Sequence, residues 1–194
     1  MQIVTCPEAA TPPDLRTQVR ELQDQAWPPG PAGSPPAPPG PVHDPALQPL
    51  SLLLVDDGRV LAALDILTKD IEHAGRRYAA GGLSTVVTRQ DVRGRGHGRR
   101  LVGQARATMA ARGLDLGLFT CDRPLRSFYE SAGWQHLPGA VLVGGTAQAP
   151  FPSDRPGFDK VTMAGFFSPR ALRDRAAFPG SRIAVHPGDI DALW

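Results

Sequence analysis

The chain contains little cysteine, little lysine and few aromatic residues. Of its 194 residues, two are cysteines, two are lysines and 6% are aromatic. Cys6 and Cys121 lie far apart in the sequence, and Cys121 ends an apolar run in which a buried thiol is usual. This pattern excludes a disulfide framework as the basis of the fold.

Long apolar runs are also absent. No stretch approaches the roughly 18 apolar residues of a membrane-spanning helix. Residues 1–8 show no charged start followed by an apolar core, which a secretion signal requires. We therefore expect a cytoplasmic protein with no membrane partner.

Neither nucleic acid nor a metal ion is expected as a partner. The net charge of +2 is too small to indicate a nucleic-acid surface, and the arginines concentrate at one loop. His43, His73, His136 and His186 have none of the spacings of a metal site.

The length and the hydrophobic content suit one folded domain. A chain of 194 residues that is 41% hydrophobic can bury a single core. We expect one domain over residues 1–194, interrupted by a Pro/Gly-rich loop at 27–41. This loop cannot form a helix or a ladder because most of its residues are proline or glycine. Composition leaves open whether the loop is a flexible insertion or a substrate lid.

Hydrophobic periodicity predicts a mixed α/β sheet. Leu15, Val19 and Leu22 recur at helical spacing, which indicates an amphipathic helix over 13–26. The later elements expected, in chain order, are strands at 50–55 and 59–67 joined as a hairpin, a strand at 78–88, a helix ending at Gly113, a strand at 116–121, a short helix at 124–133, a strand at 134–143, a loop at 144–160, a strand at 161–166, a weak helix from Ser168 and a strand at 182–185.

The most informative stretch is a Gly/Arg loop between a β-branched run and a helical pattern. Its glycines alternate at positions 94, 96 and 98, so the backbone can turn tightly and direct several N–H groups at one anion. These amides open a helix whose positive dipole end faces the same point. The loop therefore predicts a pyrophosphate cradle.

Two common phosphate loops do not fit these residues. A P-loop ends in Gly-Lys-Ser/Thr, whereas Gly98 is followed by Arg99. A Rossmann turn needs G-x-G-x-x-G inside a βαβ unit with a ribose-binding acid, and neither feature is present.

The spacing Arg-x-x-Gly-x-Gly instead resembles the acyl-CoA loop of the GNAT acetyltransferases. About thirty residues later, the segment from Asp122 to Trp134 is similar to the family's N-x-x-A-x-x-L-Y-E-x-x-G-F helix. The resemblance implies a mixed, mostly antiparallel sheet of the α+β type, splayed at the acyl-CoA site and flanked by helices. It also implies acetyl-CoA as co-substrate.

The resemblance assigns acetyl-CoA contacts residue by residue. In the family, the strand before the loop holds the pantetheine arm, the loop holds the pyrophosphate, and an asparagine after the next strand contacts the pantetheine arm. An acid stands at the asparagine position here. The matching positions are Val86, Val87, Thr88, Arg93, Gly94, Arg95, Gly96, His97, Gly98, Arg99 and Asp122.

Tyr129 matches the family's general acid, a phenol placed at the coenzyme sulfur. Its other interpretation is a tyrosine that packs under the sheet. The general base is not evident, because the glutamate that many relatives carry on the strand before the loop is replaced here by Ser84 and Thr85. Candidate bases are Asp65, Asp70, Glu72, Asp189, Asp191 and the terminal carboxylate.

The last residues resemble the aminoglycoside 2'-N-acetyltransferases, which end in an acid, one spacer and a tryptophan whose carboxylate meets the antibiotic. Trp194 matches, whereas Ala192 stands at the acid position and Asp191 precedes it. This resemblance implies an aminoglycoside as substrate and a catalytic role for the Trp194 carboxylate. The substrate-binding candidates are Asp44, Ser84, Asp189, Asp191 and Trp194.

A polycationic sugar requires a carboxylate-lined pocket. Eight acids could form it, namely Asp44, Asp65, Asp70, Glu72, Asp154, Asp159, Asp189 and Asp191. Two alternatives stay open: a GNAT enzyme acting on another amine, such as a peptide antibiotic, a polyamine or a protein N-terminus, and an acyl-CoA-binding module without turnover. The sequence is also compatible with a homodimer.

Overall fold

The computed structural model describes residues 1–28 and 41–194. The Pro/Gly-rich loop expected at 27–41 lies outside the described residues except at its two ends. In the described part of the chain, no helix is long and apolar enough to cross a membrane.

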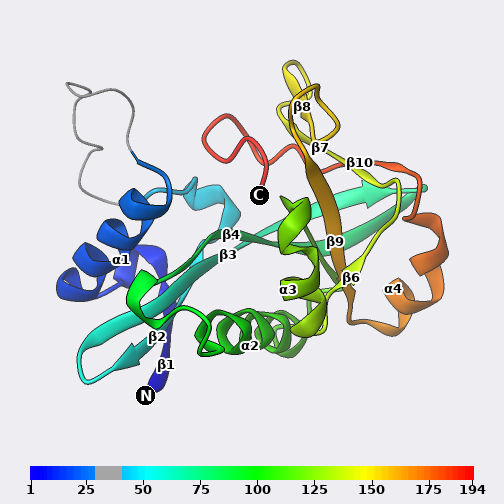
Figure 1. Cartoon of the computed structure of the whole chain (residues 1–194). Helices are drawn as coiled ribbons and strands as arrows, with labels where there is room; N and C mark the ends of the chain where they lie inside the picture. The colour runs from blue at the N-terminus through cyan, green and yellow to red at the C-terminus, as the bar shows by residue number, and fades with distance from the viewer. Residues whose placement is uncertain (29–40) are drawn as a thin grey trace.

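A seven-stranded sheet forms the centre of the molecule (Figure 1). All neighbouring strands pair antiparallel except β4 and β5, which are parallel. In spatial order the strands are β1 (Gln2–Pro7), β2 (Leu50–Asp56), β3 (Arg59–His73), β4 (Arg76–Thr88), β5 (Leu116–Asp122), β9 (Lys160–Phe166) and β6 (Gln135–His136).

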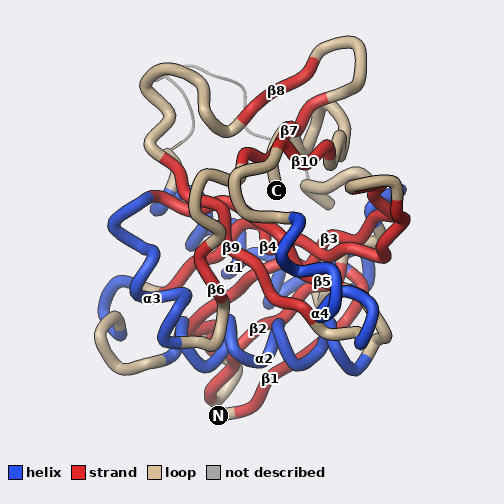
Figure 2. Tube along the Cα trace, turned by 90° about the vertical axis from the view of Figure 1, so that its right-hand side faces the viewer, coloured by secondary structure: helices blue, strands red, loops and turns tan. Residues whose placement is uncertain are grey.

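A second, three-stranded sheet stands above the first as a small arm (Figure 2). Its order is β10 (Arg182–Ala184), β7 (Val141–Gly145) and β8 (Pro150–Pro152). Strand β10 runs parallel to β7 and leads directly into the C-terminal residues. The arm therefore brings the segment after β8 close to these residues.

In residues 1–28 and 41–194, four α-helices and five short 3-10 turns surround the sheets. The helices are α1 (Pro13–Ala26), α2 (His97–Ala111), α3 (Arg126–Ser131) and α4 (Pro169–Asp174). The 3-10 turns are η1 (Glu8–Ala10), η2 (Pro45–Leu47), η3 (Gln90–Val92), η4 (Arg123–Leu125) and η5 (Arg175–Ala177).

The apolar residues of strand β2 are buried on both faces of the sheet, because helices cover both faces. Side chains alternate across a strand. Leu52 and Leu54 belong to the large core under α2, whereas Leu53 and Val55 belong to a second cluster with the apolar face of α1. An uninterrupted apolar run is therefore buried on both sides, which is typical of a central strand.

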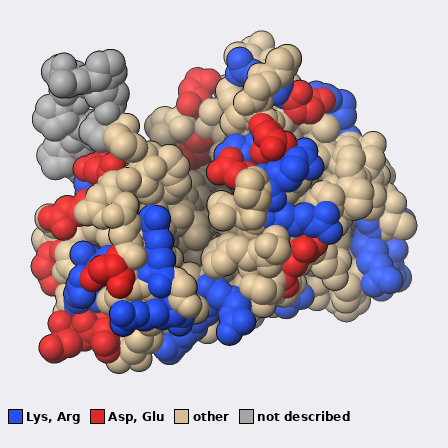
Figure 3. Space-filling view, in the orientation of Figure 1, with Lys and Arg blue, Asp and Glu red and all other residues tan. Residues whose placement is uncertain are grey.

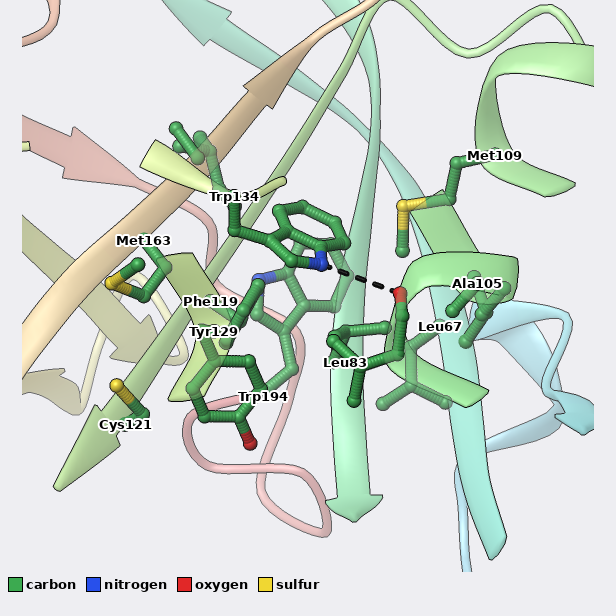
Figure 4. Close-up of a cluster of buried hydrophobic side chains, with 14 of the residues drawn as sticks. Leu67, Leu83, Ala105, Met109, Phe119, Cys121, Tyr129, Trp134, Met163 and Trp194 are labelled. Carbon is green, nitrogen blue, oxygen red and sulfur yellow. Dashed lines mark hydrogen bonds between the residues drawn. The ribbon is translucent and has the colours of Figure 1, made fainter. Parts of the chain in front are cut away.

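The sheet opens between β4 and β5. These two strands pair only at Ala80 with Leu116 and at Gly81 with Gly117, and then they diverge. The indole of Trp194 packs at the start of this opening against Gly82, and its side chain joins the buried cluster drawn in Figure 4. The carbonyl oxygen of Trp194 accepts a hydrogen bond from the Thr120 N–H at 3.4 Å.

Most predicted elements are confirmed, with three corrections. Residues 2–7 form strand β1, which the sequence analysis did not predict. The strand expected at 134–143 is split into β6 and β7 around Pro138 and Gly139, because proline cannot donate to a ladder and Gly139 has a φ of +68°. The loop expected at 144–160 contains β8.

A substitution at Gly82 tests the packing in the opening. A Cβ added there would overlap the rigid indole of Trp194. We expect Gly82→Ala to lower the free energy of unfolding by about 1 to 3 kcal/mol, as overpacking does, measured by urea denaturation. Gly103→Ala in α2 is the control, because its Cβ meets nothing closer than 3.9 Å and alanine favours a helix. Equal stability of Gly82→Ala and the parent would contradict the described packing.

Candidate active site

A cleft of about 850 Å³ lies between the end of β4, the start of α2 and helix α3. We call it the main cleft. It is lined by Ala26, Val86, Val87, Thr88, Val92, Arg93, Gly94, Arg95, Gly96, His97, Gly98, Arg99, Leu125, Phe128, Tyr129 and Ser131.

The glycines of the loop have the conformations that an anion cradle needs. Gly94 and Gly96 have φ values of +77° and +82°, which other residues rarely adopt, and a Cβ at either position would meet no protein atom within 4 Å. Gly98 packs so closely that a Cβ would lie 2.8 Å from the Thr88 hydroxyl oxygen. Any residue other than glycine would therefore be strained at positions 94 and 96, and the open side of the loop faces the cleft.

Charge adds to this geometry. Helix α2 begins at His97, and its first N–H groups have no partner within the helix, so they carry the positive end of the helix dipole. Figure 3 shows the hollow of the main cleft with Lys and Arg side chains along its lower edge. Arg95 and Arg99 of the loop are exposed. The arrangement suits a ligand that carries phosphate groups.

Strand β4 contributes a bulge beside the cleft. The register between β3 and β4 shifts between Ala63 and Asp65, and Thr85 lies in the left-handed region at a φ of +51°. A β-branched residue in this conformation is rare and strained. The bulge turns the Thr85 hydroxyl toward Asp65, whose Oδ2 accepts its hydrogen bond at 2.7 Å.

Tyr129 lies on the other wall of the main cleft. Its ring packs edge-on against Phe119 and Phe128, each with centroids 4.9 Å away, and the residue is 6% exposed. Burial, and then the nearby Cys121 and Asp122, raise the pKa of Tyr129 well above that of a free phenol. The hydroxyl is therefore protonated at neutral pH.

A second hollow of about 420 Å³ lies beside the main cleft, and we call it the side pocket. It is lined by Val42, His43, Ser84, Thr85, Phe151, Phe158, Ile190, Asp191, Ala192 and Leu193. Ser84 and Thr85 directly precede Val86 on β4, so consecutive residues of this strand line the two hollows.

A buried charge cluster forms the floor of the side pocket. His43 lies between two carboxylates, with its Nδ1 2.5 Å from Asp191 Oδ1 and its Nε2 3.3 Å from Asp65 Oδ2. Asp65 also accepts a hydrogen bond from the Ser51 hydroxyl at 2.5 Å. The second carboxylate oxygen of Asp191 accepts the backbone N–H of Asp44 at 3.0 Å.

His43 is held in its charged form. Burial lowers the pKa of His43, but the hydrogen bonds and charges of Asp191 and Asp65 outweigh burial and raise the pKa to about 10. Nearby, burial raises the pKa of Glu8, although the N–H groups of Val42 and His43 donate to its carboxylate. Among the described residues, no group of His, Cys, Asp and Glu is arranged to hold a metal ion.

The residues predicted to contact acetyl-CoA come together, with one exception. All ten positions from the strand and the loop line the main cleft. Asp122 does not line it; its exposed carboxylate forms an ion pair with Lys160 at 2.6 Å. Tyr129 lines the same cleft from α3.

The residues predicted to bind the amine are only partly brought together. Ser84 and Asp191 line the side pocket, whereas Asp189 is exposed and outside its lining. Asp44 contacts Asp191 through its backbone and caps η2 with its side chain. Trp194 lies in the opening between β4 and β5 and not in the lining of the side pocket.

Of the eight acids that could form a carboxylate-lined pocket, Asp65 and Asp191 converge on His43, and the other six do not line the side pocket. Only Asp191 lines the side pocket. Three of the other acids form exposed ion pairs with arginines elsewhere on the surface: Asp70 with Arg77, Asp154 with Arg182 and Asp159 with Arg123. Asp65 is buried behind the pocket floor, and Glu72 is exposed near the end of β3.

Several lining residues were missed by sequence reasoning. His43 follows the proline-rich stretch with no periodic pattern around it, Phe158 and Ile190 lie in irregular segments, and Phe151 lies in the three-residue strand β8. Asp65 carried a usable signal, since a lone acid inside an apolar strand must find partners if it is buried.

Comparison with protein families identifies the family to which the chain belongs. The family model of the acetyltransferase (GNAT) domain matches residues 40–137, which is half of the chain. The chain belongs to the GNAT acetyltransferases and is an acyl-CoA N-acyltransferase by family. No match was found among curated proteins.

Solved structures share the fold at low sequence identity. An acyl-CoA N-acyltransferase from Pseudomonas aeruginosa is 17% identical, with a TM-score of 0.55 over 84% of this chain and 97% of its own. ElaA of Escherichia coli is 14% identical, with the same TM-score of 0.55 and the same coverage of 84% and 97%. An aminoglycoside 6'-N-acetyltransferase solved with coenzyme A is 16% identical, with a TM-score of 0.55 over 86% and 98%.

The charge state of His43 gives a pH-dependent contribution to stability. Because its pKa is raised from 6.5 to about 10 in the folded protein, this contribution is complete below pH 6.5 and is lost as the pH rises through about 10. We expect His43→Gln to be destabilised by about 3 to 5 kcal/mol at neutral pH, as for a broken buried ion pair. The difference from the parent should shrink toward pH 10 in urea denaturation.

The matched control is Arg182→Gln, which breaks an exposed ion pair with Asp154. An exposed pair contributes about 0 to 1 kcal/mol, so this variant should stay close to the parent. A constant difference between His43→Gln and the parent from pH 6 to pH 10 would show that His43 is not the titrating group.

Proposed function

We propose that this protein transfers an acetyl group from acetyl-CoA to a primary amine, with Tyr129 as the general acid. The proposal rests on one observation above the others, namely the convergence of Tyr129 and the glycine cradle on a single cleft. As part of this proposal, residues 1–194 form a single domain, and the reaction takes place in the cytoplasm without a metal.

The residues of the main cleft fit acetyl-CoA. Gly94 and Gly96 leave open the space that a Cβ would fill, and the amides at the start of α2 face the same space. The exposed Arg95 and Arg99 supply positive charge for phosphates. Beyond Gly81, β4 pairs with no strand of the described residues on its β5 side, so its backbone at 86–88 can pair with an extended amide chain such as pantetheine.

The co-substrate supplies an acetyl thioester, which is open to attack by an amine. The nitrogen forms a bond to the acetyl carbon, the carbon–sulfur bond breaks, and the nitrogen loses its proton to water. Tyr129 donates its proton to the departing sulfur and regains one from water. A phenol has a higher pKa than a thiol, so the transfer requires a short, fixed hydrogen bond. The aromatic contacts of Tyr129 hold it for this purpose.

None of the candidate bases is assigned to the reaction. Asp65 accepts hydrogen bonds from Ser51 and Thr85 and faces His43, so its oxygens are occupied. Asp191 is equally occupied by His43 and the Asp44 N–H. We propose that the amine binds in the side pocket as its ammonium form and loses one proton to water there, so that the free base attacks the thioester and releases its second proton to water.

Two acceptor classes follow from these observations. An aminoglycoside is supported by the resemblance at the chain end, which includes the proposed carboxylate of Trp194, and by the fold shared with an aminoglycoside 6'-N-acetyltransferase. Another primary amine is supported by the lining of the side pocket, in which six of ten residues are apolar. An acyl-CoA-binding module without turnover is the alternative that the next experiment addresses, and a homodimer stays a prediction.

Replacing the phenol tests the acid role. Tyr129→Phe keeps the ring and removes the proton, so kcat should fall about 100-fold or more while the Kd for acetyl-CoA is unchanged. The measurements are thiol release in the presence of an amine and calorimetric titration of acetyl-CoA.

Tyr78→Phe is the matched control, since Tyr78 is the other tyrosine of the chain and lies outside the linings of both hollows. Its hydroxyl donates a hydrogen bond to Asp174 at 2.9 Å. It should retain the parent kcat. An unchanged kcat for Tyr129→Phe, with chemistry shown to limit the rate, would remove Tyr129 from the mechanism. Acetyl-CoA binding without thiol release by the parent would favour the non-catalytic module.

A further inference from the structure

The walls of the side pocket are apolar and aromatic. Phe151 and Phe158 meet edge-on with ring centroids 5.8 Å apart, and Leu193 continues the apolar wall. Ile190 is 66% exposed beside them, although a large aliphatic side chain is usually covered. Such a surface favours a ligand with an apolar body.

The floor of the same pocket carries a net negative charge. Asp65 and Asp191 contribute two carboxylates, and the imidazolium of His43 neutralises one of them. The three side chains are almost fully buried, so solvent screens their charge only weakly. The Ser84 and Thr85 hydroxyls add polar atoms at the junction with the main cleft. The floor therefore attracts a single ammonium group.

Cations lie over the aromatic wall. The guanidinium of Arg155 stacks 4.4 Å from the centroid of Phe151, and the ammonium of Lys160 lies 5.1 Å from that of Phe158. Arg155 is exposed. Lys160 is paired with Asp122, so Arg155 supplies the uncompensated positive charge at this wall, and it disfavours a ligand that brings a second ammonium group toward it.

From this lining we infer that the acceptor is a primary monoamine on an aromatic or branched apolar body, which binds in the side pocket with its amine toward β4. The inference rests on the proposed acetyl transfer and narrows its substrate class. It selects the apolar amine over the polycationic aminoglycoside, because the walls of the side pocket are apolar and aromatic and the exposed guanidinium of Arg155 lies over them.

The test compares acceptors in one assay on the purified full chain. Thiol release from acetyl-CoA is measured with 2-phenylethylamine, with the aminoglycoside kanamycin, with spermidine and with no acceptor. We expect kcat/KM for 2-phenylethylamine to exceed that for either polycation at least ten-fold. Mass spectrometry of the product identifies the acetylated amine.

Two variants connect this preference to named residues. Phe151→Ala should raise the KM for 2-phenylethylamine about ten-fold through the loss of an aromatic contact, with acetyl-CoA affinity unchanged. Arg155→Glu should increase kcat/KM for spermidine several-fold by reversing the charge over the aromatic wall. Leu172→Ala is the control, because Leu172 is an exposed residue of α4 outside both hollows.

The outcomes separate the inference from the proposed function. Turnover of kanamycin or spermidine above 2-phenylethylamine would overturn the substrate class and leave acetyl transfer intact. No acetylated product from any amine would overturn the proposed function and the inference with it. Unchanged kinetics of both Phe151→Ala and Arg155→Glu, at parent stability, would remove the side pocket as the acceptor site.

Discussion

The structure depends on the point at which β4 and β5 part. Only two residue pairs join these strands, and beyond them the β5-facing edge of β4 has no strand neighbour. Unpaired backbone groups in a protein interior must find partners elsewhere. The opening accounts for the position of the Trp194 indole at its start and leaves the end of β4 free to line the main cleft. A fully paired sheet would leave no room for a ligand between the two strands.

The bulge at Thr85 divides the site into two environments. On one side lies the glycine cradle at the positive end of α2, which suits phosphates. On the other side lies the side pocket, with its negative floor and aromatic wall. Opposite charges on the two sides of one strand suit a reaction in which an anionic donor meets a cationic acceptor.

The buried cluster also joins distant parts of the chain. His43 lies in the segment that precedes β2, and its partner Asp191 lies 148 residues later in the C-terminal segment. Two carboxylates so close together would repel each other in a buried site without the imidazolium between them. This ion pair therefore fixes the C-terminal segment against the rest of the fold while it shapes the side pocket.

Local patterns predicted much of the fold and the donor half of the site. The alternating glycines and the apolar face of α2 are patterns of residues that are close in sequence. Apolar periodicity therefore predicted the helix, and the glycine spacing predicted the loop and a phosphate-bearing ligand. The acceptor half was not predictable in the same way. Tertiary contacts bring together His43 and Asp191, which lie in irregular segments, and Phe151, which lies in the short strand β8. For the same reason the sequence could not show whether the acids converge, since ion pairs such as that of Asp154 with Arg182 form between side chains far apart in sequence.

The most direct test of this account is hydrogen exchange of the backbone amides with and without acetyl-CoA, compared with acetyl-pantetheine, which lacks the pyrophosphate. Amides at 94–99 should be protected by acetyl-CoA alone, because only its pyrophosphate reaches the cradle, whereas amides at 86–88 should be protected by both compounds. Acetyl-CoA binding that leaves exchange at 94–99 unchanged would contradict the central claim that this loop holds the co-substrate.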